Sequence, residues 1–406
     1  MTATSGMLTR RDFVTRAAAA AVSPLIFDKT IASITVRVAA PNFDPWLEID
    51  AGALAHNVRA ASRMSGGKPV IAVAKNNAYG HGLATAGPIF ERIAEVPVLA
   101  VVRPEEALAL RRAGVKKPIL LMGPASEEEL LELVPMDVIQ APYRAAAPTI
   151  LSRVSERLKR PVRVHLYIDT GMHRMGMPAA EALPWVEALS KSGAVRIEGA
   201  FTELTEDADF DRAQAGRLRT VQAEARARGI AIGQLHAASS DAIQHQTAET
   251  FLDAVRPGLA LYGGYVSDRA MQQGGFRPSY RLKARVIRVD RLSAGDGVSY
   301  HHRWKTDKPA WTATLAIGHV DGYPSGAVKG CEVMVRGKLY PVIGNVSASH
   351  TILLLGDEQS VQVGDKATLV GPDHPALHPN EIAKRAGYSE YNMFMHLSPQ
   401  LQRRIV

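Results

Sequence analysis

Between residues 46 and 285, short apolar runs alternate with amphipathic stretches, and this alternation constrains the fold more than any other feature. Residues 104–113, for example, place apolar side chains at helical spacing and end at Gly114, a common helix stop. The apolar runs predict strands at residues 70–74, 98–102, 118–122, 164–168, 194–201 and 232–236. Strands that alternate with helices favour an α/β fold with a parallel sheet, and a segment of this length suits a (β/α)8 TIM barrel.

After about residue 286 the pattern changes to short β-branched runs separated by Gly, Asp and Pro. Strands are predicted at residues 285–292, 312–317, 332–335, 338–343, 351–355 and 366–370. We therefore expect three parts: residues 1–40 as an export signal and linker, 41–285 as the barrel, and 286–406 as a C-terminal all-β domain.

The N-terminus requires a separate interpretation. Arg10 and Arg11, followed by the apolar residues 17–27, resemble a twin-arginine export signal, and residues 38–40 (VAA) offer a cleavage site. The apolar stretch is too short for a stable membrane-spanning helix. We expect a periplasmic or otherwise exported protein without stable membrane insertion. A frayed amphipathic terminus is the alternative, and whether the signal is cleaved stays open.

Charge and cysteine content narrow the partners. The formal net charge is +8, and residues 1–40 contribute +3 of it. The remaining excess is spread out, with no basic run that contains interleaved aromatic residues, so no nucleic-acid partner is expected. The single cysteine, Cys331, excludes an internal disulfide and is interpreted as a packed apolar residue.

Lys75 lies at the end of the buried strand predicted at residues 70–74, where a charged side chain is unusual and requires an explanation. The following stretch, residues 76–82 (NNAYGHG), permits turn geometry and close approach of the backbone to a ligand. A solvated lysine at a strand end is the plainer interpretation. However, barrel active sites lie at the carboxyl ends of strands, and Arg174, His236 and Arg256 also fall near such ends.

Seven stretches in order resemble the alanine racemase family, which comprises fold-type III enzymes that use pyridoxal 5′-phosphate (PLP). They are residues 46–57 (WLEID to HN), 72–82 (AVAKNNAYGHG), 169–176 (DTGMHRMG), 236–240 (HAASS), 255–263 (VRPGLALYG), 298–304 (VSY to W) and 317–324 (IGHVDGYP). This resemblance implies a PLP-dependent amino-acid racemase, an isomerase, that forms a homodimer with shared active sites and requires no metal.

The resemblance implies two catalytic residues. Lys75 holds PLP as a Schiff base and then acts as a base on one face of the substrate Cα, which requires a neutral amine. Inverting the carbon needs a second proton-transfer group on the other face. Tyr300 is the candidate, and the resemblance implies that it comes from the β domain of the partner subunit.

Other residues are assigned to the cofactor by the same resemblance. Arg256 faces the pyridine nitrogen, and because a guanidinium only donates hydrogen bonds, this nitrogen stays unprotonated. Arg174 meets the cofactor phenolate and the substrate carboxylate, the latter with the amide near Ala348. The remaining expected cofactor contacts are His236 near the ring, Ser240, Gly258 and Leu259 at the phosphate, and Tyr79 and Tyr391 closing the site.

Four positions depart from the family pattern. Tyr167 replaces a carbamylated lysine, so a bound anion or the phenol itself must orient Arg174. Glu203 replaces a histidine, and a carboxylate near Tyr300 would raise the pKa of this phenol. His319 and Ala348 replace bulkier residues at the entrance, which suggests substrates larger than alanine. The preferred amino acid is not decided by these positions.

Two other functions remain open. Glu203 and His319 also suit a PLP-dependent epimerase that acts on a biosynthetic intermediate. A PLP-binding carrier with little activity is the third hypothesis, but a carrier needs only Lys75, whereas this chain has Tyr300 as well.

Overall fold

The computed structural model describes residues 44–406, and its N-terminal half contains a parallel barrel. The barrel strands pair in the order β2 (Ile71–Val73), β3 (Val98–Val101), β4 (Ile119–Leu121), β5 (Val138–Gln140), β6 (Val162–Asp169), β8 (Val195–Phe201) and β9 (Gln234–His236). Residues 254–255 close the ring, because Ala254 bridges to His236 and Val255 bridges to Val70, both in parallel. The predicted (β/α)8 barrel is therefore confirmed.

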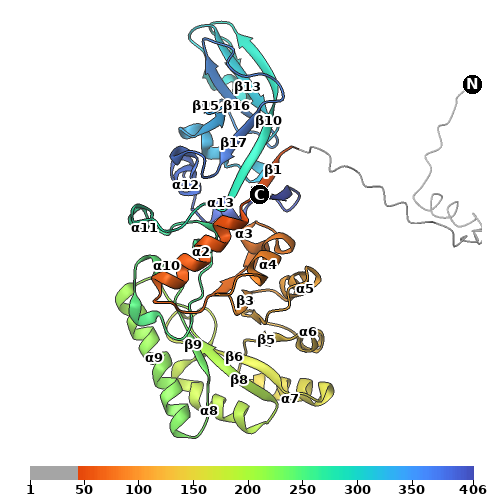
Figure 1. Cartoon of the computed structure of the whole chain (residues 1–406), viewed down its shortest axis with the longest axis vertical. Helices are drawn as coiled ribbons and strands as arrows, with labels where there is room; N and C mark the ends of the chain where they lie inside the picture. Colours follow the sequence, from red (N-terminus) through yellow and green to blue (C-terminus); the bar gives the residue numbers. More distant parts are fainter. Residues whose placement is uncertain (1–43) are drawn as a thin grey trace, which may run out of the picture. The chain divides into compact units, whose positions relative to one another are not determined.

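Helices follow the barrel strands and lie outside them, from α4 to α9 in Figure 1. Their bounds are α2 (Ala51–Met64), α4 (Leu83–Glu91), α5 (Pro104–Arg112), α6 (Glu127–Leu133), α7 (Ala147–Leu158), α8 (Ala179–Lys191), α9 (Ala208–Ala227), α10 (Ser240–Gln244) and α11 (Asp268–Gln273). Every residue of β3 and β4 is buried, as expected for strands covered on both faces. Helix α5 buries Ala107 and Leu110 against them, whereas Leu108 is only half-buried.

The C-terminal half forms a mainly antiparallel sheet in the order β13-β16-β15-β14-β17-β10-β1-β18. The strands are β1 (Trp46–Ile49), β10 (Tyr280–Leu292), β13 (Ala310–Leu315), β14 (Glu332–Val335), β15 (Lys338–Ile343), β16 (Thr351–Gly356), β17 (Lys366–Val370) and β18 (Gln402–Ile405). Strand β10 also pairs with β13, so the sheet curls back on itself. The all-β character predicted for this part is confirmed.

Strand β10 links the two halves of the chain. It begins at Tyr280, so the boundary expected near residue 286 falls inside it. Its first residues pair with β1, which is assigned by sequence position to the barrel segment but lies in the β sheet. Trp46 of β1 is completely buried there, and burial of this large side chain stabilises the pairing.

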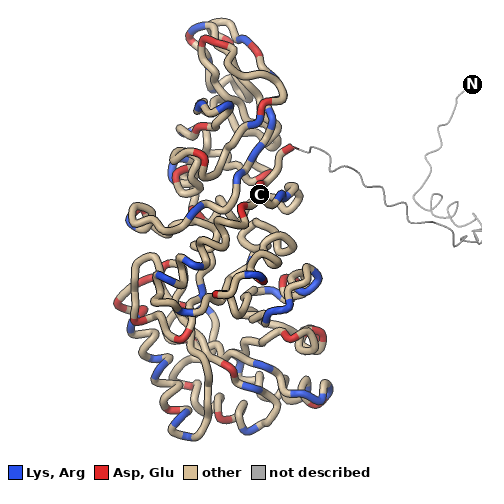
Figure 2. The backbone as a smooth tube through the Cα atoms, in the orientation of Figure 1, with Lys and Arg blue, Asp and Glu red and all other residues tan. Residues whose placement is uncertain are grey.

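Charged residues of both signs are interspersed over the described chain (Figure 2). At the amino ends of β6 and β8, Arg163 donates to Glu198 over 2.7 Å and to Asp137 over 2.5 Å. This cluster lies at the barrel end opposite to the strand ends that carry Lys75 and Arg256, so we interpret it as structural. Within residues 44–406, no helix combines the length and apolar character needed to cross a membrane.

Candidate active site

Lys75 begins α3 (Lys75–Tyr79), directly after β2, and this turn is left-handed. Residues 76–79 have φ values of 54, 56, 53 and 49°. Asparagine tolerates this region, but Ala78 and Tyr79 each cost about 1–2 kcal/mol in it. The Asn77 side chain offsets part of this cost, because its Oδ1 accepts from the Leu83 N–H over 3.0 Å. The turn thus holds Lys75 and Tyr79 at the same barrel end.

The charge environment of Lys75 suits an amine that must be neutral. Burial is the main cause that lowers the pKa of Lys75, and the positive charges of Arg174 and Arg256 lower it further. Glu203 and Glu106 oppose this effect. A lowered pKa increases the fraction of nucleophilic amine near neutral pH.

Arg256 is buried, with 2 % of its side chain exposed, and it organises the barrel centre. Its Nη2 donates to Glu203 Oε2 over 3.0 Å and to the Thr202 carbonyl over 2.9 Å. Its Nη1 donates to His236 Nδ1 over 2.9 Å. Because arginine only donates, His236 Nδ1 must be an unprotonated acceptor, and His236 is neutral.

The neutral state of His236 fixes a further hydrogen bond. Its proton then lies on Nε2, which donates to His165 Nδ1 over 2.9 Å. Burial, with the positive charge of Arg256 adding to it, lowers the pKa of His236 well below its usual value. The His236 ring also stacks on Phe201, with 5.1 Å between centroids and 8° between planes.

Arg174 lies on the segment after β6, and two side chains contact it. Its Nη2 is 3.6 Å from Glu203 Oε1. It also lies close enough to Tyr167 to lower the pKa of this phenol, although burial has the larger and opposite effect. Burial raises the pKa of Tyr167 to about 12, so this phenol is neutral at physiological pH. Arg174 therefore lies near Lys75 with one neutral and one anionic partner.

Ser240, at the start of α10, binds two backbone amides. Its Oγ accepts from the N–H groups of Gly258 and Ala260 over 3.0 and 3.1 Å. Gly258 cannot carry a side chain, since a Cβ there would lie 2.1 Å from Tyr79 Oη. The Tyr79 ring stacks on Tyr262 at 4.7 Å. A hydroxyl, backbone amides and a phenol at one barrel end are groups that can bind a phosphate.

Two more residues predicted at this phosphate site lie close by. Leu259 follows Gly258 in a short 3-10 turn and is buried. Tyr391 precedes α13 (Asn392–Met395). Burial raises the pKa of Tyr79 well above its ordinary value, and the proximity of the Tyr391 phenol raises it further. Burial also raises the pKa of Tyr391, so both groups are neutral hydrogen-bond donors near neutral pH.

The structure places Tyr300 and Ala348 on the β domain, not on the barrel. Tyr300 is 68 % exposed, and its carbonyl accepts from Asn345 Nδ2 over 3.4 Å. The Ala348 carbonyl accepts from the Val320 N–H over 3.2 Å, beside the exposed His319. Within one chain, the predicted site is thus divided between the two halves.

Sequence reasoning missed Glu106 as a site residue. This buried carboxylate accepts from the backbone N–H groups of Asn77, Val102 and Arg103 over 3.1 to 3.3 Å. It therefore supports the left-handed turn after Lys75 from the neighbouring strand end. The only local signal is an acidic residue in the first turn after Pro104, a position that ordinarily indicates a helix cap.

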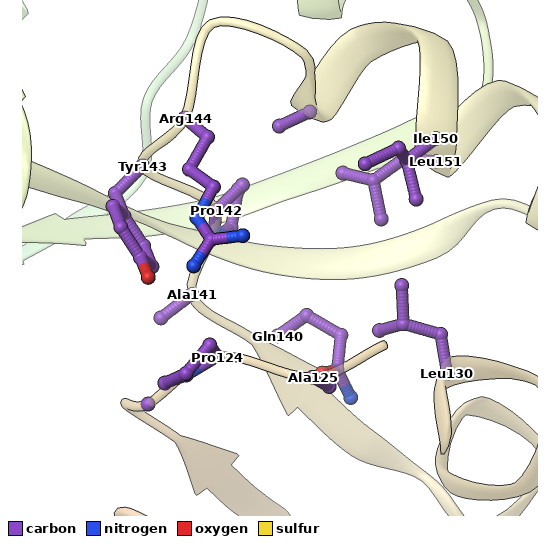
Figure 3. Close-up of a pocket in the computed structure, with 12 residues that line it drawn as sticks. Pro124, Ala125, Leu130, Gln140, Ala141, Pro142, Tyr143, Arg144, Ile150 and Leu151 are labelled. Atoms are coloured by element: carbon purple, nitrogen blue, oxygen red, sulfur yellow. The ribbon is translucent and has the colours of Figure 1, made fainter. Parts of the chain in front are cut away.

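An apolar pocket of about 80 Å³ lies between the ends of β4 and β5 and the helices α6 and α7 (Figure 3). Pro124, Leu130, Tyr143 and Leu151 are among its lining residues. Arg144 also lines it, and Tyr143 makes an edge contact with Tyr167 at 6.2 Å between ring centroids. We do not assign this pocket to the reaction, because Lys75 and the other predicted site residues do not line it.

Two family models cover most of the chain. The model for "Alanine racemase, N-terminal domain" matches residues 49–266, and the model for "Alanine racemase, C-terminal domain" matches residues 279–405. The chain belongs to the alanine racemase family. This membership confirms the resemblance seen in the sequence, and it confirms the expectation of an isomerase of the racemase class.

Individual alanine racemases are similar over nearly their whole length. The alanine racemase of Desulfovibrio desulfuricans is 33 % identical over 366 residues, which cover 88 % of this chain and 97 % of the relative. Alanine racemase 2 of Caldanaerobacter subterraneus is 30 % identical over 88 % of this chain and 93 % of its own. The structure of the Clostridium difficile 630 alanine racemase superposes with a TM-score of 0.83 at 26 % identity, covering 90 % of this chain and 96 % of the other.

Proposed function

We propose that this racemase uses PLP attached to Lys75 and interconverts L- and D-amino acids by a two-base mechanism. The observation that carries the proposal is the position of Lys75 at the end of β2, where burial and two arginines lower its pKa. Members of the alanine racemase family use PLP, and the residues around Lys75 fit this cofactor. Gly258 in particular has no Cβ, so the hydroxyl of Tyr79 can approach its backbone, beside the hydroxyl of Ser240.

Each part of the barrel site has a role toward the cofactor. Ser240, Gly258 and Leu259 would hold the phosphate, with Tyr79 and Tyr391 beside it. Arg256 would donate to the pyridine nitrogen, and the neutral His236, which accepts from Arg256, keeps this guanidinium in place. When bound, the cofactor supplies an electron sink for the negative charge that develops at the substrate Cα.

Proton transfer is assigned to two side chains. Lys75 removes or returns a proton on one face of the substrate Cα, while Arg174 binds the substrate carboxylate with the amide near Ala348. Tyr300 of a second copy serves the opposite face. Its 68 % exposure in a single chain supports this assignment, because a phenol that completes the site of another subunit must project from its own.

Mixing two inactive variants tests the shared site. Lys75→Ala and Tyr300→Phe should each be inactive as pure dimers. After mixed refolding in equal amounts, half of the dimers are hybrids, and each hybrid contains one site with both native groups. Activity should then return to about a quarter of the wild-type value, from the statistics of a two-fold dimer. Absence of any recovery, with hybrid dimers verified by tagged purification, contradicts shared active sites.

For the substrate, we propose amino acids larger than alanine in addition to alanine. The support is the replacement of bulky entrance residues by His319 and Ala348, both exposed on the β domain. Incubation with each L-amino acid, followed by chiral chromatography, tests this directly. Inversion of alanine alone rejects the broad specificity. Inversion of no amino acid, despite bound PLP, favours the epimerase suggested by Glu203, or a carrier.

We also propose export through the twin-arginine route. The motif with Arg10 and Arg11 lies outside the described residues 44–406, so its support is the sequence alone. Fractionation of cells that express wild type and a variant with Arg10→Lys and Arg11→Lys tests it. Equal amounts of both proteins in the cytoplasmic fraction contradict the proposal.

A further inference from the structure

Glu203 bridges two arginines that are far apart in the sequence. It follows β8, and each of its carboxylate oxygens faces a different guanidinium. Oε2 accepts from Arg256 Nη2 over 3.0 Å, and Oε1 lies 3.6 Å from Arg174 Nη2. The Glu203 side chain is 25 % exposed, between a buried arginine and a half-exposed one. The carboxylate therefore couples the barrel centre to the outer, substrate-facing arginine.

Arg174 needs such a partner. Its side chain is 56 % exposed, and it stands on a loop between Gly171 and Gly176, both with positive φ. A free arginine in this setting samples many rotamers. A ligand that binds it must restrict the side chain to one of them, which costs conformational entropy. Among the described residues, its two side-chain partners are the neutral phenol of Tyr167 and the carboxylate of Glu203. Only the second supplies a full negative charge.

We propose that Glu203 is a positioning residue that holds the Arg174 guanidinium beside Lys75 and ties it to Arg256. It thereby performs, from a different strand, the orienting role that the family resemblance gives to a carbamylated lysine at position 167. No carbamate is then needed in this chain. The inference rests on the proposed racemase function where KM and kcat are measured. It does not rest on that function where the reactivity of the Arg174 guanidinium is measured by chemical labelling.

Two effects of Glu203 on substrate binding oppose each other. The carboxylate competes with the substrate carboxylate for Arg174, but it also orders this side chain in advance. The competition is weak, because the contact described for Glu203 is with Nη2 and the other N–H donors of the Arg174 guanidinium stay open to the substrate. Ordering therefore dominates, and loss of the charge should weaken substrate binding more than it slows the chemical step.

The experiment compares Glu203→Gln, Glu203→Asp and the control Glu224→Gln. Glutamine keeps the shape and one acceptor oxygen, so Arg256 retains a partner. Glu224 is an exposed carboxylate on α9, while the ion pairs described for Arg174 and Arg256 go to Glu203. KM and kcat are measured with L-alanine. Separately, phenylglyoxal labelling of the Arg174 peptide is followed by mass spectrometry.

For Glu203→Gln we expect KM to rise about two- to fivefold, the range for an ion pair at this exposure, with a smaller change in kcat. Labelling of Arg174 should become faster, because its guanidinium is no longer held. Glu203→Asp keeps the charge and should recover part of both effects, whereas Glu224→Gln should behave as wild type. Carbamylation plays no part, so adding bicarbonate should change nothing.

A folded Glu203→Gln variant with wild-type KM and wild-type labelling overturns the inference. So does a fall in kcat with KM and labelling unchanged, because Glu203 would then act through Arg256 alone. If Glu203→Gln does not fold, the same two measurements on Glu203→Asp decide. If the wild type racemises no amino acid, the proposed function fails, whereas the labelling rates still test the position of Arg174.

Discussion

Replacing Gly258 by alanine should selectively damage the predicted phosphate site. The new Cβ would lie 2.1 Å from Tyr79 Oη and 2.7 Å from Tyr79 Cζ. Carbon atoms ordinarily keep about 3.5 Å from such neighbours, so the overlap with the hydroxyl is roughly 1.4 Å. Tyr79 cannot easily withdraw, since it is 3 % exposed and stacked on Tyr262. Gly258 must then shift, which moves its N–H away from Ser240 Oγ.

The expected magnitude follows from this overlap. Added atoms in a closely packed site cost about 1–3 kcal/mol of folding stability. If the displaced Gly258 N–H carries this whole cost into cofactor binding, the PLP dissociation constant rises about 5- to 150-fold. Absorbance titration of the apoprotein with PLP measures this constant, and circular dichroism checks the fold. Gly216→Ala in α9 is the matched control, because its Cβ would meet nothing within 4 Å. It should leave PLP affinity unchanged and stabilise the helix by up to about 1 kcal/mol.

A double-mutant cycle with Tyr79→Phe tests the reasoning further. Removing the hydroxyl eliminates the 2.1 Å clash and leaves the contacts of 2.7 and 3.1 Å with the ring. Gly258→Ala should therefore cost less in the Tyr79→Phe background than in wild type, by at least about 0.5 kcal/mol. The steric argument would be refuted if Gly258→Ala lowered PLP affinity equally in both backgrounds, or if Gly258→Ala alone bound PLP as tightly as the wild type.

Three further predictions concern the barrel. Lys75→Ala should lose the absorbance of lysine-bound cofactor while its circular dichroism stays native, and retention of this absorbance would exclude Lys75 as the attachment point. Burial lowers the pKa of both His81 and His165 to about 4. The unfolded chain, with histidine pKa near 6.5, then binds protons first, so stability is lost as the pH falls between these values. Going from pH 7 to pH 5 should lower the free energy of unfolding by about 2 kcal/mol per histidine, as measured by urea unfolding. His81→Gln should reduce this loss, and the same pH dependence in the variant and the wild type would contradict the prediction. Leu110→Ala in α5 should destabilise by about 2–5 kcal/mol because Leu110 is completely buried, and the half-buried Leu108→Ala should cost clearly less in the same assay.

Much of the fold could be predicted from local patterns. The runs at residues 98–102 and 118–122 lie within one residue of β3 and β4, and the strands expected at 332–335 and 338–343 coincide with β14 and β15. Strand β5 was not predicted, because its apolar run is only Val138 and Ile139, between Asp137 and Gln140, whereas the runs that contain β2 and β4 have five apolar or small residues. The same holds for the closure of the barrel through residues 254–255, which form only isolated bridges.

The sequence by itself determined the family, the order of strands and helices, and the residue types at the site, because these depend on motifs and on periodicities within a few residues. Only the tertiary structure decided that Glu203 lies between Arg174 and Arg256, that Glu106 supports the turn after Lys75, and that β1 pairs with β10. Distances between such side chains depend on closure of the barrel and on the register of distant strands, and neither is encoded within a local window of the chain.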